Sequence, residues 1–326
     1  MDLGRPGVIQ YRHYRNNDPP LVLALWNASG FARGGASEIS HDLLDLLLFS
    51  QPYFDRHGLI VASQDQRLVG MVHAGFGCNE HGTDLNRNDG VICQLLVHPE
   101  RRRQGIGREL MQRARQYLTD HGATTIHAGP GPGRDPFYCG LYGGSEAAGF
   151  LATDEGVAEF LADCGFDAAD RFAIYQRPLE LDSAEAVDFR SVQWKRQVRI
   201  EISAQNNSGD WWWNNRFGRL DYVCFRLLPK DDDQPLASLT LVGLDQFIPK
   251  WNSRAIGLAD IHVVEQHRRQ GLGRLLITET LRRLKQETIS LVEAHASESD
   301  EALAGLLGGC GFQRVDAGTQ YLWAAS

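Results

Sequence analysis

The sequence has no Cys-x-x-Cys pair and no long apolar run near its start. Its six cysteines are scattered, and several lie within apolar strand or helix patterns, where a free cysteine packs as a small core residue. Without a charged and then apolar N-terminal segment, we expect neither a secretory signal nor a membrane span. The pattern therefore predicts a cytoplasmic protein with reduced thiols and no metal site.

An excess of positive charge is also missing. The chain contains 33 Lys and Arg against 41 Asp and Glu, which gives a formal net charge of -8. Proteins that bind nucleic acids or anionic membranes use a broad positive field, so we expect neither partner. With 43% hydrophobic residues the chain has enough apolar side chains to fill substantial cores, which argues against disorder.

Two common nucleotide-binding motifs are absent as well. No Gly-Lys-Ser/Thr is present, which excludes a P-loop, and the third glycine and the β–α alternation of a Rossmann fingerprint are missing. The stretch GPGPGR at 129–134 is rich in glycine, but its prolines lack N–H donors and no helix pattern follows directly. We interpret it as a rigid loop.

What the sequence does contain is a repeat. RRRQGIG at 101–107 and HRRQGLG at 267–273 are nearly identical, and Arg102 and Arg268 lie 166 residues apart (268 − 102). Each stretch follows an apolar strand pattern and precedes a helix pattern. Because 326 residues exceed what one core usually fills, we predict two similar domains, residues 1–182 and 183–326. The boundary is expected in the acidic stretch near residues 180–187.

The elements around the two motifs also correspond. Alternating apolar runs predict hairpins, and apolar residues at helical spacing predict helices. In pairs from the two copies, the expected elements are hairpins over 58–76 and 222–243, helices over 106–118 and 272–284, and strands over 124–128 and 289–296. A short helix in each copy then ends in Cys-Gly-Phe, where glycine fits a helix stop. A final strand is expected to close each domain, and two entry helices near 20–50 occur only in the first copy.

The repeated turn has the features of an anion-binding site. The start of a helix presents unpaired backbone N–H groups and the positive end of the helix dipole, so it attracts phosphate. Glycine lets the backbone approach a bulky anion, and neighbouring arginines add charge-assisted hydrogen bonds. A pyrophosphate is the expected ligand. The alternative is a tight turn with a solvated basic face, and the duplication in one strand–turn–helix setting favours the phosphate site.

LLVHPERRRQGIGRELM resembles the signature of the GNAT superfamily of acetyl-CoA-dependent N-acetyltransferases, whose turn reads Arg/Gln-x-x-Gly-x-Gly/Ala. Both copies match it, and the resemblance covers most of the chain as a tandem. It implies an α/β fold of the α+β type, with two domains that each contain a mixed, mostly antiparallel sheet flanked by helices. The fourth and fifth strands of each domain would splay apart and hold the pantetheine arm of acetyl-CoA.

The resemblance also assigns cofactor-binding residues. The residues expected to bind acetyl-CoA are Leu95, Leu96, Val97, Arg102, Arg103, Gln104, Gly105, Ile106, Gly107 and Arg108 in the first copy, with Ile261, His262, Val263, Arg268, Arg269, Gln270, Gly271, Leu272, Gly273 and Arg274 in the second. A backbone N–H of the motif strand would polarise the acetyl carbonyl. No metal is implied.

The catalytic acid of many relatives is a tyrosine four residues before the closing glycine, but here that position holds Leu161 or Leu307. A good thiol leaving group, with a pKa near ~8.5, makes the acid dispensable. Other candidates lie in the additional loop that follows the fifth strand of the first copy, because the family's acceptor cleft opens there. These candidates are Tyr138, Tyr142, Ser145 and Glu146. The alternative for this stretch is a surface loop tied down by its aromatic side chains.

Asp260, aligned with Gln94, is a further candidate for binding or deprotonating an amine, or else a strand-end polar group satisfied by a neighbour. We take Tyr142, Glu146 and Asp260 as the catalytic candidates. The triplet Trp211–Trp213 either walls a substrate pocket or packs the two domains together, and we prefer packing.

The function expected from the resemblance is transfer of an acetyl group from acetyl-CoA to an amine of a small molecule or peptide by direct attack. The alternative is a non-catalytic acyl-CoA-binding sensor or assembly module. The sequence leaves open the acceptor, the oligomeric state and which domain reacts, although the loop and the entry helices favour the first domain.

Overall fold

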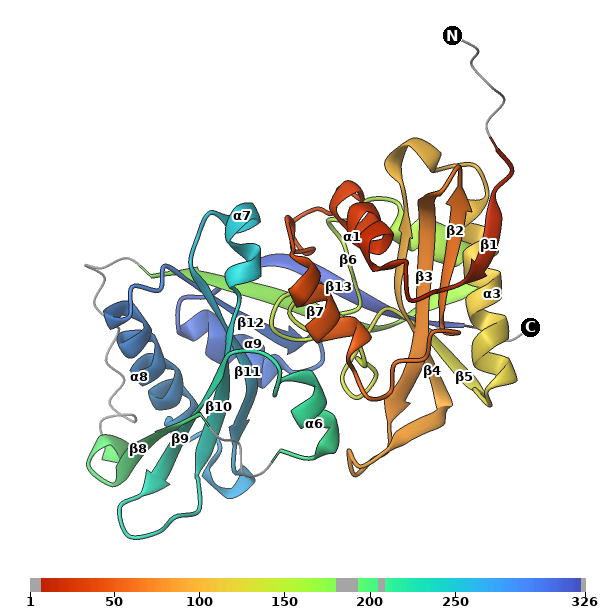
Figure 1. Cartoon of the computed structure of the whole chain (residues 1–326). Coiled ribbons are helices and arrows are strands. Elements are labelled where there is room, and N and C mark those ends of the chain that lie inside the picture. The colour runs from red at the N-terminus through yellow and green to blue at the C-terminus, as the bar shows by residue number, and fades with distance from the viewer. Residues whose placement is uncertain (1–6, 180–192, 205–208, 324–326) are drawn as a thin grey trace.

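The computed structural model describes residues 7–179, 193–204 and 209–323, and we call residues 7–179 the first half and residues 193–323 the second half. The expected boundary near residues 180–187 lies outside the described residues. Within these ranges the strands form a single 13-stranded sheet with helices on both of its faces (Figure 1). No helix among the described residues is long and apolar enough to cross a membrane.

The first half begins the sheet. Its strands are β1 (Gln10–His13), β2 (Leu59–Gln64), β3 (Arg67–Cys78), β4 (Leu85–Val97), β5 (Thr125–Ala128), β6 (Phe150–Leu151) and β7 (Phe166–Pro178). Its helices are α1 (Pro19–Ala28), α2 (His41–Leu44), which continues as the π-helical η1 (Asp45–Phe49), the 3-10 turn η2 (Pro99–Arg101), α3 (Ile106–Asp120) and α4 (Val157–Asp163). The predicted hairpin, entry helices and motif helix are all confirmed.

The second half repeats this order with fewer entry elements. Its strands are β8 (Val198–Ser203), β9 (Tyr222–Pro229), β10 (Ala237–Gly243), β11 (Ala255–Val263), β12 (Leu291–Ser297) and β13 (Gln313–Trp323). Its helices are α6 (Trp211–Arg216), η3 (Asp245–Phe247), α7 (Ile248–Trp251), η4 (Glu265–His267), α8 (Leu272–Gln286) and α9 (Glu301–Gly309). The short α6 is found where the first half has α1 and α2, between the first strand and the hairpin.

Local sequence explains most of these boundaries. Asp65 and Gln66 both adopt positive φ, which gives the tight turn between β2 and β3 the twist that a two-residue hairpin needs. The closing glycines Gly165 and Gly311 have φ near +80°, namely 81° and 83°, directly after α4 and α9. Left-handed backbone of this kind ends a helix and favours glycine, so the predicted helix stops are confirmed.

The final strands do not close their own halves as the sequence predicted. The order across the middle of the sheet is β5, β13, β7, β12, so each final strand lies beside the fifth strand of the other half. Tyr321 of β13 pairs with Ala128 of β5, and Ile174 of β7 pairs with His295 of β12. Figure 1 shows β13, blue at the end of the colour bar, running into the first half. We call this arrangement the strand exchange.

The two halves also share buried apolar side chains. The largest core cluster combines residues of the first half with Leu244, Phe247, Ala255, Leu291 and Tyr321 of the second. A separate cluster lies under α8 and α9 in the second half. Burial of apolar surface is the main stabilising term in folding, so the halves stabilise each other through a common core.

Candidate functional site

The two repeated turns have the same backbone. After β4 the chain passes through η2, and Arg103 and Gly105 then adopt φ of 60° and 83° before α3 begins. After β11 it passes through η4, and Arg269 and Gly271 adopt φ of 62° and 92° before α8. The strand–turn–helix prediction is confirmed in both copies, down to the left-handed residues.

Both helix starts are open to an anion. Neither Gly105 nor Gly271, the residues that precede α3 and α8, places a side chain on the first helical N–H groups. A Cβ atom at Gly105 would meet nothing within 4 Å. Uncapped N–H groups at the positive end of a 15-residue helix are suited to bind phosphate.

The second glycine of each turn has a packing role. A Cβ atom at Gly107 would lie 3.2 Å from the ring of Phe160 on α4, and one at Gly273 would lie 2.9 Å from Leu306 on α9. The glycine is thus needed because a neighbouring helix packs against the start of the motif helix. The expected role of this glycine in the close approach of a ligand stays a prediction.

Arg102 and Arg268, the arginines that begin the Arg-x-x-Gly-x-Gly motif, form hydrogen bonds within their own turns. Nε of Arg102 donates to the Val97 carbonyl at 3.2 Å, and Nε of Arg268 donates to the Val263 carbonyl at 3.0 Å. Arg102 also donates to the carbonyl of Ser29 at 2.7 Å. These arginines therefore tie the turn to the end of its strand.

The other predicted turn residues fall into two groups. Arg103, Arg108 and Arg269 are exposed, where they can reach a phosphate, and Arg274 is half-buried. Ile106 and Leu272 are buried at 1% exposure and reach a ligand only through their backbone. The side chains of Gln104 and Gln270 donate to the carbonyls of Glu100 and Gln266, four residues earlier in each case.

The motif strands run past their parallel partners. The β4–β5 pairing ends at Ile92 and Ala128, and the β11–β12 pairing ends at Leu258 and Ala294. Each motif strand then continues for five residues (97 − 92 and 263 − 258), and this stretch contains the residues expected to hold pantetheine. We call Cys93–Val97 and Ala259–Val263, which lie beyond the pairing with β5 and β12, the first and second splay.

Each splay contains a β-bulge, at Cys93 in the first and at Asp260–Ile261 in the second, but the exposure differs. In the first half Gln94 is 2% exposed, and α1 packs on β3 and β4. In the second half the aligned residue, Asp260, is exposed and adopts a φ of 51° at the bulge. The second splay therefore opens to solvent where the first is covered.

The loop after β5 contributes to this cover. Tyr138 is 1% exposed, its Oη lies 3.1 Å from Nδ1 of His73, and its ring stacks on Trp26. Burial lowers the pKa of His73 to about 3, so this imidazole is neutral at physiological pH. Phe137 stacks on the same histidine at 4.1 Å. Aromatic side chains of the loop thus occupy the side of the first half where α1 lies.

Tyr142 does not join the other catalytic candidates. Its hydroxyl donates to Oδ2 of Asp154 at 2.6 Å and accepts the N–H of Leu151 at 3.0 Å. Burial is the main reason that the pKa of Tyr142 is well above its ordinary value. Both hydrogen-bonding functions of this hydroxyl are used to hold the loop.

Glu146 and Asp260 do come together, although they belong to different halves. Oε1 of Glu146 accepts the backbone N–H of Asp260 at 3.3 Å, at the bulge of β11. Nε1 of Trp213 donates to Oδ2 of Asp260 at 2.6 Å. The loop of the first half therefore delivers a carboxylate into the second splay.

The surroundings of Glu146 favour its protonated form. Burial, followed by the negative charge of Asp260, raises the pKa of Glu146 to about 7, against the opposing influence of His295 and Arg216. Arg216 is itself paired with the buried Asp135. A carboxylate with a pKa near neutrality is suited to take a proton at physiological pH.

Sequence reasoning missed two buried ionisable side chains and one half-buried arginine near Glu146. Glu293 and His295 of β12 are 0% and 5% exposed, and Arg33, between α1 and α2, lies beside Glu293. The signal was present in the strand pattern, because two ionisable residues two positions apart share one face of an otherwise apolar strand.

The tryptophan triplet divides between packing of the two halves and a hydrogen bond to Asp260. Trp211 and Trp212 pack on Tyr53 of the first half, with ring centroids 5.6 and 5.5 Å apart. Trp213 instead binds Asp260 beside the second splay. The preferred interpretation, packing between the halves, is confirmed for the first two residues.

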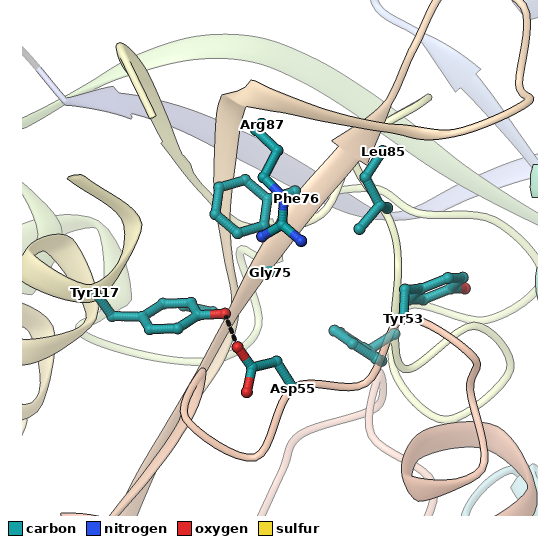
Figure 2. A pocket seen from close by; sticks show the side chains of 9 residues that line it. Tyr53, Asp55, Gly75, Phe76, Leu85, Arg87 and Tyr117 are labelled. Atoms are coloured by element: carbon teal, nitrogen blue, oxygen red, sulfur yellow. Dashed lines mark hydrogen bonds between the residues drawn. The ribbon is translucent and has the colours of Figure 1, made fainter. Parts of the chain in front are cut away.

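A small cavity lies at the other end of β3 and β4, away from the splay. Figure 2 shows Tyr117, whose hydroxyl donates to Asp55 at 2.9 Å, with Arg87 stacked on Phe76. This cavity has a volume of about 20 Å³, which accommodates roughly one water molecule. It is therefore too small for an acyl donor or an amine acceptor. In the described part of the chain, no three His, Cys, Asp or Glu side chains gather as metal ligands would.

Comparison with known proteins agrees with this geometry. The sequence model of the acetyltransferase (GNAT) family matches residues 24–142 and 187–312. A mycothiol acetyltransferase from Salinispora arenicola (strain CNS-205) is 38% identical over 105 residues, which make up 31% of this chain and 31% of that protein. The similarity thus spans about a third of this curated relative.

Solved structures share the fold along nearly the whole chain. A tandem GNAT protein from the clavulanic acid biosynthesis pathway superimposes with a TM-score of 0.70 at 19% identity, covering 98% of this chain and all of that one. A GCN5-related glucosamine N-acetyltransferase region of a fungal multi-domain β-N-acetylglucosaminidase has a TM-score of 0.69 at 17% identity, covering 99% of this chain and 39% of that one. At such identities the likeness establishes the fold alone.

Proposed function

Because the chain belongs to the acetyltransferase (GNAT) family, we propose that it transfers an acetyl group from acetyl-CoA to an amine in its second splay. The observation that carries the proposal is the hydrogen bond from the Asp260 backbone to Oε1 of Glu146. It sets a carboxylate with a pKa of about 7 beside the strand expected to hold the thioester.

Cofactor binding is assigned to the turn before α8 and to β11. Uncapped N–H groups at the start of α8 and the exposed Arg269 bind the pyrophosphate. Ile261–Val263 lies beyond the pairing of β11 with β12, although β10 still pairs with its other side. The side that faces away from β10 binds the pantetheine arm, and one of its N–H groups polarises the acetyl carbonyl.

Glu146 is the proposed general base. An amine that arrives protonated gives one proton to the Glu146 carboxylate, and its nitrogen then attacks the thioester carbonyl. This attack forms the C–N bond, and collapse of the tetrahedral intermediate re-forms the carbonyl and breaks the C–S bond. CoA leaves as a thiolate whose low basicity makes a dedicated acid unnecessary, and the second proton of the nitrogen passes to solvent water. Leu307, at the position of the family's tyrosine, is consistent with this course.

Asp260 is proposed to attract the amine. Its carboxylate is exposed and held by Trp213, so it faces solvent at the mouth of the second splay. An exposed carboxylate beside the base favours a cationic acceptor, and we propose a small-molecule or peptide amine.

For the first half we propose a different function, binding of acyl-CoA without turnover. It has the same open helix start before α3, but its splay is covered by α1 and by the buried Tyr138. This is the non-catalytic alternative restricted to one half of the chain.

The test is release of free CoA thiol from acetyl-CoA with a panel of primary amines, monitored with a thiol reagent. We expect sustained release that requires an amine and a matching acetylated product. Calorimetry with CoA, on the wild type and on a Gly271→Ala variant, reports binding separately. Binding without amine-dependent release would leave only the acyl-CoA-binding function.

A further inference from the structure

The strand β12 carries two buried ionisable side chains that the proposed reaction does not use. Glu293 is 0% exposed and His295 is 5% exposed. The alternating residues Val292, Ala294 and Ala296 pack into the core under α8, so Glu293 and His295 point to the opposite face. That face meets the loop of the first half.

Glu293 makes a set of contacts with that loop. Its Oε1 accepts the backbone N–H of Ser145 at 3.0 Å and a hydrogen bond from Nε2 of His295 at 3.2 Å. Its Oε2 lies 3.6 Å from Nη2 of Arg33. The backbone of Gly144 is so close that a Cβ atom there would lie 1.8 Å from Oε1. The carboxylate thus contacts the two residues that precede Glu146.

We propose that Glu293 is a positioning residue, whose buried carboxylate holds Gly144 and Ser145 and thereby fixes Glu146 at the bulge of β11. The part that concerns catalysis rests on the proposed function, whereas the anchoring of the loop rests on the contacts alone. Glu293 itself does not touch the reacting atoms.

The charges around Glu293 keep it ionised. Burial opposes its charge, but the hydrogen bonds from His295 and Ser145 and the charge of Arg33 hold the pKa of Glu293 below its ordinary value. The carboxylate of Asp316 on β13 faces Arg33 from the other side, 3.9 Å away. An ionised carboxylate is the stronger acceptor for a backbone N–H, so the charge strengthens the anchor.

Arg33 is held in place by the second half. Its guanidinium lies 5.2 Å from the ring centroid of Trp251, whose Nε1 donates to the Arg33 carbonyl at 3.0 Å. Lys250 donates to the neighbouring carbonyls of Phe31 and Ala32, at 2.6 Å each. The anchor therefore involves elements of both halves.

The first half has no equivalent of this anchor. Glu293 pairs with Gly257 in the parallel register, and the corresponding pair in the first half is His127 with Val91. His127 lies 3.2 Å from Asp89 on the adjacent strand. The anchor is therefore found beside the second splay, where we place the reaction.

Around Glu146 the groups that set its protonation come from several elements. Asp260 on β11 raises its pKa, and His295 on β12 and Arg216 on α6 lower it. Cys139 of the same loop is coupled to Glu146 and has a pKa raised by burial to about 12, so it is a neutral thiol at physiological pH. If Glu146 were displaced from these groups, its pKa would change, and the pH dependence of the reaction rate would change with it.

The experiment uses full-length Glu293→Gln, with Glu298→Gln as the matched control, because Glu298 directly follows β12 and its carboxylate pairs with Arg314 on β13. Hydrogen exchange of peptides covering residues 141–149 should accelerate about tenfold or more in Glu293→Gln. The kcat should fall by roughly 10- to 100-fold, the size of effect that a small misplacement of a catalytic group produces. The KM for acetyl-CoA and all properties of the control should stay unchanged.

A double-mutant cycle with Glu146→Gln separates positioning from a general loss of structure. If Glu293 acts through Glu146, Glu293→Gln lowers the kcat no further once Glu146 is replaced. Equal losses in both backgrounds would overturn the proposal. Unchanged exchange of residues 141–149 would overturn it too, whether or not the protein acetylates an amine.

The loop side of the contact provides a second variant. Gly144→Ala leaves β12 intact but places a methyl group against Glu293 at a residue with φ of 102°. It should loosen the same peptides and lower the kcat, as Glu293→Gln does. If no acetyl transfer is found in the wild type, the proposed function fails, and hydrogen exchange in both variants still decides the anchoring.

Discussion

The two halves of the chain carry the same turn and helix, but they differ in what lies beside the strand that precedes the turn. In the first half Gln94 is buried under its own entry helix and loop. In the second half Asp260 is exposed, and Glu146 of the first half's loop accepts its backbone N–H. The two copies therefore differ: the splay of the first half is covered, and that of the second half is exposed. The exposed splay receives a carboxylate, Glu146, from the first half.

The largest effect is expected from separating the halves. Because the strand exchange places β13 beside β5 and β7 beside β12, each half alone would expose unpaired strand edges. We expect halves expressed alone to be insoluble. A protease site inserted within residues 180–192 should leave two fragments that elute together and keep their acetyl transfer activity.

Size-exclusion chromatography after cleavage measures this outcome. Two soluble, separable and folded fragments would contradict the exchange. Retained activity in either isolated fragment would also contradict the dependence of the second splay on Glu146.

The next largest effect is expected from Glu146→Gln. Loss of a general base lowers the kcat by about 10² to 10⁴-fold, whereas Tyr138→Phe, which removes the hydroxyl buried in the first half, should change it less than about threefold. In the wild type the rate should fall as the pH drops through about 7, where burial raises the pKa of Glu146. Comparable losses of kcat in Glu146→Gln and Tyr138→Phe would contradict the assignment of the reaction to the second splay.

The same substitution should stabilise the fold. The folded-state pKa of Glu146 is raised from 4.5 to about 7, so the folded protein binds this proton more tightly than the unfolded chain. Its contribution to stability is therefore largest below pH 4.5 and is lost as the pH rises to about 7. Glu146→Gln should gain up to about 3 kcal/mol at pH 8, measured by denaturant unfolding, and should remove that pH dependence.

A smaller effect separates the two turns. Gly271→Ala should raise the KM for acetyl-CoA roughly tenfold, because a methyl group at φ of 92° strains the residue that presents the helix start. Gly105→Ala, at φ of 83°, imposes a similar strain but should leave the kcat and this KM nearly unchanged. The reverse pattern in steady-state kinetics would move the reaction to the first half.

The smallest effect is expected from Trp213→Phe, which removes the N–H that holds Asp260. The freed carboxylate should turn toward water, so its repulsion of Glu146 weakens. The acid limb of the pH–rate profile should then move to lower pH by less than about one unit. Trp211→Phe is the matched control, since that side chain packs on Tyr53 instead. Identical profiles for both variants would remove Asp260 from the reaction.

Local sequence patterns predicted the elements well, because they depend on neighbours in the chain. Gly105 and Gly271 mark left-handed residues, and the spacing of Leu110 or Leu276 with their apolar neighbours defines the buried helix stripes. The pairing of the final strands was predicted wrongly. Two alternating strands of similar length carry no local signal that tells which fifth strand each will join.

The site was predicted residue by residue but not as an assembly. Glu146 and Asp260 were both chosen, yet nothing in the spacing of the sequence places a loop of one half against a bulge of the other. The strand pattern signalled Glu293 and His295, but it did not reveal what Glu293 holds, because the fold alone brings Ser145 and Arg33 to it.

The strand exchange also governs how the protein is made. A ribosome delivers β5 long before β13, and the strand that must lie between β5 and β7 is the last of those described to be synthesised. The sheet of the nascent first half therefore lacks the strand between β5 and β7 until nearly the entire second half has been translated. Contacts between segments so distant in the chain form slowly. Premature release or ribosome stalling before Gln313 would thus leave an intermediate with open sheet edges that is prone to aggregate.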